Sequence, residues 1–169
     1  IVHGLTILAQ SMSLGGVLFL VFLARPFERM LGGIGHEIRR RTRLIALWSA
    51  AGLAACEAST IFLQGAVLVG TIDIGWFNVL HAEFAEAGLV KIAGAALIVA
   101  MLAGRRDRAP AVTLLAALAS VLAAATLTTH ANARLEGRLP LLLVEGLHQL
   151  GAAIWIGGIP CGLMALNRC

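Results

Sequence analysis

Long apolar stretches dominate the chain, and short segments rich in Arg, Pro and Gly separate them. A helix needs about 20 mostly apolar residues to cross the hydrocarbon core of a bilayer. Five stretches qualify: about Val2–Leu23, Leu44–Val69, Phe84–Ala103, from Pro110 to about Thr128, and from Pro140 to about Leu166. The pattern predicts an all-α fold, a polytopic transmembrane helix bundle with about five spans, as a single transmembrane domain over residues 1–169.

The segments between the spans carry helix-ending signals. Arg25-Pro26 is expected to end the first span, and a loop is expected from Leu31 to Arg43. Pro110 and Pro140 suit the first turn of a helix, where the missing backbone N–H costs nothing. The first residue is Ile1 rather than Met, so we expect a fragment or an incompletely described chain.

Composition agrees with a membrane protein. Hydrophobic residues make up 59% of the chain and charged residues 13%, against about half and about a quarter in soluble domains. The 19 glycines suit helices that pack closely in lipid. The formal net charge of +4 needs no nucleic-acid partner, because arginines in membrane proteins gather in loops on one side.

The distribution of Arg predicts the orientation. Five spans place ten basic residues on one side of the membrane: Arg25, Arg29, Arg39, Arg40, Arg41, Arg43, Arg105, Arg106, Arg108 and Arg168. The other side has only Arg134 and Arg138. The positive-inside rule then predicts an outer N-terminus and a cytoplasmic C-terminus.

Four of the five histidines are expected at or near the outer side: His3, His81, His130 and His148. His148 lies inside the last span, about 12 Å below the outer surface at 1.5 Å per residue. An ionisable residue inside a span is costly and marks a functional candidate, and imidazole suits copper, zinc and iron. A shared metal site is therefore predicted, although a histidine at an interface, such as His81 or the cytoplasmic His36, can also simply bind headgroups or water.

Carboxylates inside the spans add to this chemistry. Glu145 shares a helix face with His148 and is a candidate ligand, a partner that fixes the imidazole tautomer, or an interfacial acid. Glu57, near the middle of the second span, is a candidate ion or proton relay or the partner of a donor on a neighbouring helix. Lys91 is a candidate ion-pair partner for Glu57, although the two residues lie at different apparent depths.

Sulfur-containing residues give weaker signals. Met12 lies about two and a half turns deeper than His3, and its thioether suits Cu(I) or, alternatively, simple packing. Cys56, Cys161 and Cys169 lie apart and form no disulfide framework. The sequence has no GxSxG, HExxH, Walker or GxGxxG motif, so soluble enzymology is not expected.

The last span carries a resemblance to a known family. Residues 146–159, GLHQLGAAIWIGGI, resemble the "LH-LL-A-A-x-W-x-GG-L" segment of the copper resistance D (CopD) family, and Thr129-His130-Ala131 resembles the "H-A-A" turn before it. His3, Gly15-Gly16 and Phe19 fit the family's first span less specifically. Family members usually carry more helices, and Gln149 stands where the family often has an aliphatic residue.

This resemblance implies a bacterial inner-membrane protein that moves copper from the periplasm toward the cytoplasm, often with a small periplasmic copper protein. It implies copper-ligand roles for His130 and His148, and a packing role for Trp155, Gly157 and Gly158. In the complete hypothesis copper is captured at the outer side and passed inward. This needs no bond-breaking chemistry, so no enzyme is expected. The candidate metal residues are His148, His130, His3, His81, Glu145 and Met12, with Glu57 as a deeper relay.

Two alternatives remain open at this point. One is a b-type heme subunit of an electron-transfer complex, in which His148 pairs with His3 or His130 as axial ligands. The other is an accessory membrane subunit without a cofactor, packed into a larger complex.

Overall fold

The structure, a computed structural model, describes residues 2–104, 110–129 and 138–166. These parts form helices and contain no strand, which confirms the all-α prediction. In chain order the elements are α1 (Val2–Leu18), η1 (Phe19–Leu23), α2 (Ala24–Leu31), α3 (Gly33–Ile72), α4 (Trp76–Leu80), α5 (Glu83–Ala103), α6 (Ala111–Leu127), α7 (Arg138–Ala152), η2 (Ala153–Gly158) and α8 (Ile159–Leu166). The elements η1 and η2 are π-helical turns.

Four helices are long and apolar enough to cross a membrane: Val2–Leu31, Gly33–Ile72, Glu83–Ala103 and Leu139–Gly158. They correspond to four of the five predicted spans. The remaining span coincides with α6, an apolar but shorter helix of 17 residues.

Two predicted breaks are wrong. The first helix continues past Pro26 to Leu31, because the π-helical turn just before this proline already interrupts the regular hydrogen bonds. The loop expected over Leu31 to Arg43 is instead a tight turn at Gly32, whose φ is +55°, followed by the first turns of a 40-residue helix. Ion pairs from Glu37 to Arg40 and Arg41, at i,i+3 and i,i+4, favour this helical continuation.

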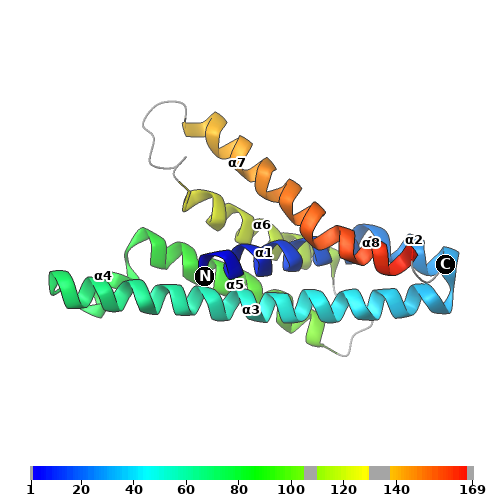
Figure 1. The fold of residues 1–169 in the computed structure, drawn as a ribbon, viewed down its shortest axis with the longest axis horizontal. Coiled ribbons are helices and arrows are strands. Elements are labelled where there is room, and N and C mark those ends of the chain that lie inside the picture. Colours follow the sequence, from blue (N-terminus) through cyan, green and yellow to red (C-terminus); the bar gives the residue numbers. More distant parts are fainter. Residues whose placement is uncertain (1, 105–109, 130–137, 167–169) are drawn as a thin grey trace.

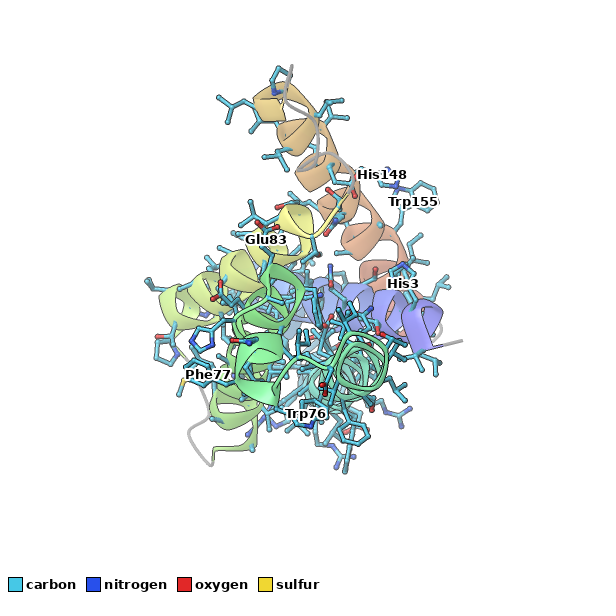
Figure 2. All side chains as sticks on the ribbon, turned by 90° about the vertical axis from the view of Figure 1, so that its left-hand side faces the viewer. His3, Trp76, Phe77, Glu83, His148 and Trp155 are labelled. Carbon is cyan, nitrogen blue, oxygen red and sulfur yellow. The ribbon has the colours of Figure 1, made fainter. Side chains whose placement is uncertain are left out.

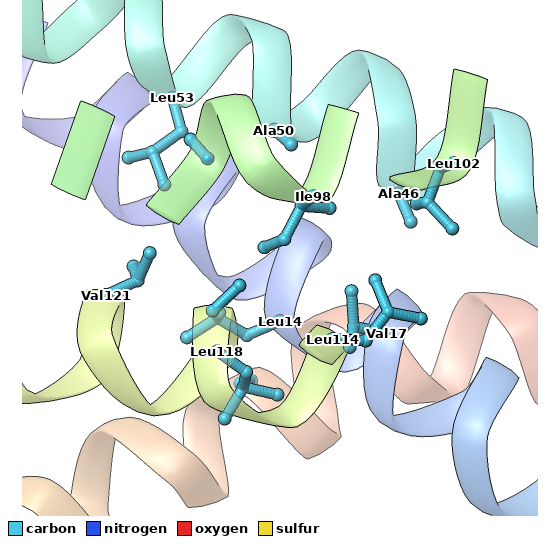
Figure 3. Packing of buried hydrophobic residues seen from close by; sticks show 13 residues of the cluster. Leu14, Val17, Ala46, Ala50, Leu53, Ile98, Leu102, Leu114, Leu118 and Val121 are labelled. Carbon is cyan, nitrogen blue, oxygen red and sulfur yellow. The ribbon is translucent and has the colours of Figure 1, made fainter. Parts of the chain in front are cut away.

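The core lies where α1, α3, α5 and α6 meet. Figure 1 shows α3 running the length of the molecule, with α1, α5 and α6 beside it. The buried side chains in Figure 3 come from all four helices: Leu14, Val17, Ala46, Ala50, Leu53, Ile98, Leu102, Leu114, Leu118 and Val121. Small residues bring the backbones together. A Cβ atom on Gly16 would lie 2.8 Å from that of Ala46, so this close packing requires glycine.

α7 is arranged differently from the other long helices. In Figure 1 its first half diverges from the bundle, and the chain returns to α1 only near η2. Only 6% of its most apolar window is buried, against 44% for Val2–Leu31 and 39% for α5. At the contact, a Cβ on Gly15 would overlap the carbonyl oxygen of Ala153, and a Cβ on Gly157 would lie 2.8 Å from Cα of Gly15. The two backbones therefore touch directly.

Candidate functional site

A buried ion pair joins α3 to α5. The Lys91 ammonium donates to Glu57 Oε1, and the two residues are only 9% and 4% exposed. The structure thus brings together the two residues whose depths looked different in the sequence. A charged pair in such surroundings is stable only because each partner compensates the other.

The position of this pair along the bundle can be measured from Arg43, which joins α3 to the end of α5. Arg43 lies at the end of the molecule that carries the arginines from Arg25 to Arg43, here called the basic end. Arg43 Nε donates to the carbonyl oxygen of Leu102 at 2.6 Å, and Nη2 donates to that of Gly104. Glu57 lies about four turns of α3 beyond Arg43, and Lys91 lies about as far before Gly104 in α5. At 1.5 Å per residue both side chains therefore leave their helices about 20 Å from the anchor.

Apolar and small residues enclose the pair. A Cβ on Gly88 would lie 2.8 Å from Cδ1 of Ile61 and 3.5 Å from Glu57 Oε2, so the glycine leaves room for the carboxylate. Toward the basic end the same interface continues with buried Leu53 and Ala95. The pair therefore lies buried in the contact between α3 and α5.

A second polar connection joins α1 to α7. Gln10 Nε2 donates to Gln149 Oε1 at 3.2 Å, and Gln149 Nε2 donates to Glu145 Oε1 at 3.0 Å. All three side chains are half-buried. Gly146, on the next residue along α7, faces Thr126 of α6, since a Cβ there would lie 3.4 Å from Thr126 Cγ2. The amide chain thus lies where α7 diverges from the bundle.

His148 lies beside this chain but faces outward. Its side chain is exposed, as is that of Trp155, and Figure 2 shows both on the side of α7 turned away from the bundle. Glu145 lies one turn earlier in the same helix and is bonded to Gln149. In the described structure, His148 is therefore available to a ligand on the outer surface of the helix rather than in its packed interface.

The other candidate residues lie on different elements from His148. His3 is exposed in the first turn of α1, and Met12 is half-buried deeper in that helix. His81 Nδ1 lies 2.8 Å from the carbonyl oxygen of Phe77, and the two rings are 4.4 Å apart. Phe77 and His148 appear on opposite sides of the molecule in Figure 2, so His81 does not join His148.

Two histidines remain. His36 Nδ1 lies 3.6 Å from Glu28 Oε1 at the Arg-rich end of the molecule, and His130 lies outside the described residues. Across residues 2–104, 110–129 and 138–166, no group of three or more His, Cys, Asp or Glu side chains is arranged to hold a metal ion.

Sequence reasoning missed the part played by two amides. Gln149 stood out only as a departure from the CopD pattern, and Gln10 was not considered. The available signal was the presence of glutamines in apolar spans, because a buried amide needs a hydrogen-bond partner; a third one, Gln64 in α3, is exposed. By contrast, the hydroxyls of Ser13 and Thr42 are fully buried and have no partner within the described part of the chain.

Comparison with known proteins adds no relative. No family model, curated protein or solved structure matches this chain. The resemblance of residues 129–159 to the CopD family therefore stays a prediction from the residues themselves.

Proposed function

We propose that this protein handles copper in a bacterial inner membrane, taking the ion from the periplasmic face toward the cytoplasm. Residues 146–159, which carry the resemblance to the CopD family, lie in a helix long and apolar enough to cross a membrane. The observation that carries the proposal is the position of His148 in this helix, exposed and one turn from a carboxylate that is held in place.

In this proposal the hydrogen bonds from Gln10 to Gln149 and from Gln149 to Glu145 hold Glu145 in position beside His148, where both can bind the ion. Gln10 holds Gln149, and Gln149 holds one oxygen of Glu145, which leaves the other carboxylate oxygen free to face a cation next to the imidazole. His3, His81 and His130 are capture ligands at the outer side, and Met12 offers a soft thioether deeper in α1. The site is completed by a ligand brought to the exposed face of α7, and His130 is the candidate in this chain.

The proposed topology has five spans, with α6 as the fourth. It places the N-terminus outside and the Arg-rich end, from Arg25 to Arg43, in the cytoplasm, as the positive-inside rule requires. Glu57 was predicted as a candidate relay, but in the described conformation its carboxylate forms an ion pair with Lys91. We propose that it passes ions or protons only in a state in which this pair opens.

Copper binding by the purified protein tests the proposal. Competition with a Cu(I) chelator is expected to show a tight site that His148→Ala abolishes. His36→Ala is the matched control, because His36 is equally an exposed histidine but lies at the basic end beside Glu28. Unchanged stoichiometry and affinity in His148→Ala would contradict the proposal. A visible spectrum of the same sample tests the heme alternative, for which a reduced α band is required.

One observation favours the alternative of an accessory membrane subunit. Leu143 and Leu147 of α7 and Trp155 of η2 are 67–71% exposed, more than expected for a helix enclosed by its own chain. A photo-crosslinker in place of Leu147 would distinguish the two cases in native membranes. Crosslinks to one defined protein favour the subunit, and crosslinks to lipid alone favour a helix that faces the bilayer.

A further inference from the structure

The helix α2 presents two arginines on a face that packing keeps outward. Ala24, Phe27, Glu28 and Leu31, at i, i+3, i+4 and i+7, are buried or half-buried, whereas Arg25, Pro26, Arg29 and Met30 are exposed. Phe27 stacks on Phe19 with ring centroids 5.6 Å apart. A Cβ on Gly35 would lie 2.7 Å from Cα of Glu28, so α3 holds α2 closely. The packing of α2 therefore places both arginines on its outward face.

These arginines differ from the others described at this end of the molecule. Arg39 pairs with Glu28 at 3.1 Å, Arg40 and Arg41 pair with Glu37 at 2.8 Å, and Arg43 caps α5. The hydrogen bonds from Arg40 and Arg41 lower the pKa of Glu37 to about 2, so this carboxylate stays charged and paired at neutral pH. Neither Arg25 nor Arg29 has an acidic side chain within ion-pair distance in the described residues.

The position of α2 matches the depth of lipid headgroups. The 17 residues of α1 and 5 of η1 together span roughly 30 Å, which is the thickness of the hydrocarbon core. Arg25 therefore falls at the boundary of the core, and Arg29 lies one turn further out. Phe22 and Met30, which are 59% and 71% exposed, provide apolar surface on either side of this boundary.

We propose that Arg25 and Arg29 bind the phosphate of an anionic phospholipid in the leaflet at the basic end of the molecule. Two guanidinium groups at i and i+4, with no acidic partner among the described residues, can donate to one phosphate group, and the exposed apolar side chains beside them contact its acyl chains. Charge complementarity selects an anionic lipid over a zwitterionic one. This site is separate from the proposed copper ligands and does not depend on them.

Lipid retention by the purified protein tests this site. Native mass spectrometry would compare bound phosphatidylglycerol with bound phosphatidylcholine of the same acyl chains. The double variant R25Q/R29Q is expected to weaken phosphatidylglycerol binding roughly 30-fold, at about 1 kcal/mol per arginine. R40Q/R41Q is the matched control, because it also removes two charges from this end but only from arginines already paired with Glu37, and its binding is expected to stay within about twofold of the parent protein.

Other outcomes would overturn the proposal. Equal losses in both double variants would mean that bulk charge, not a site, attracts the lipid. Unchanged binding in R25Q/R29Q would mean that these arginines are not involved. Displacement of the lipid by an equal concentration of inorganic phosphate would identify free phosphate as the ligand. R25K/R29K, which keeps both charges, is expected to restore most of the binding and shows that any loss in R25Q/R29Q is not misfolding.

Discussion

The α3–α5 interface and the helix α7 use polar residues in opposite ways. Between α3 and α5 the charges of Glu57 and Lys91 are buried, paired and surrounded by apolar side chains. On α7 the side chains of Glu145, His148 and Gln149 are half-buried or exposed. Here the hydrogen bond to α1 joins two neutral amides, Gln10 and Gln149, and Gln149 in turn donates to Glu145. The first arrangement holds two helices in register, whereas the second leaves a titratable group open to a ligand or partner.

This difference separates a region that contributes to stability from the region proposed to bind a ligand. A buried ion pair is expensive to break, because removing one partner leaves an uncompensated charge in a low dielectric. A hydrogen bond between membrane helices is worth much less, about 0.6 kcal/mol on average. Mutations at the two regions should therefore differ in size and in readout.

The largest effect is expected at the ion pair. Lys91→Met leaves the Glu57 carboxylate buried without a partner and should destabilise the protein by about 3–5 kcal/mol. Reversible unfolding in mixed detergent micelles measures this change. Glu86→Gln on the same helix is the control, because Glu86 is exposed and should contribute little.

The double variant Glu57→Leu/Lys91→Met sharpens this test. Replacing a whole buried pair by apolar residues of similar size is often neutral, so most of the lost stability should return. If the double variant is as unstable as the single one, the side chains would be required for packing rather than for charge compensation. If Lys91→Met alone is stable, Glu57 must be neutral or solvated in the folded protein.

The pair also shows where sequence reasoning reached its limit. Hydropathy correctly predicted the positions of the apolar helices, because their length and composition are local properties. It did not predict that α3 begins before Leu44, at Gly33. The depth of Glu57 in the membrane was therefore estimated from the predicted start of the span at Leu44, and Glu57 and Lys91 looked as if they lay at different depths. The true register comes from Arg43, whose contacts with Leu102 and Gly104 lie far away in the sequence.

The sequence predicted which residues could form the candidate site, but not how their side chains are arranged in space. His148 and Glu145 were found because ionisable groups in a span are rare. Which way His148 faces depends on how α7 and η2 pack on α1, and the closest contact is that of Ala153 and Gly157 in η2 with Gly15. Several glycine pairs in the sequence could have made such a contact, and only the tertiary structure shows which one does.

The next largest effect is expected at this crossing. Gly157→Ala places a methyl group against the backbone of Ser11 and Gly15, and backbone cannot yield as a side chain can. Overpacking of this kind should cost about 1–3 kcal/mol. Gly158→Ala is a close control, because no atom lies within 4 Å of its added Cβ; it should be neutral or stabilising by up to about 1 kcal/mol. Equal effects of the two substitutions would mean that α7 does not pack on α1 through Gly157.

The smallest effect is expected at the amide chain. In a double-mutant cycle of Gln10→Leu and Gln149→Leu, the coupling energy should be about 0.6 kcal/mol, several times smaller than the coupling between Glu57 and Lys91. Leu is a strong helix former and suits an apolar span, so the helix should tolerate Gln149→Leu. Because Gln149 holds Glu145, the same substitution should weaken the proposed copper binding at His148 more than it weakens folding. A coupling energy near zero, with copper affinity unchanged, would show that α1 and α7 are joined by their glycines alone and that the amides do not prepare the proposed site.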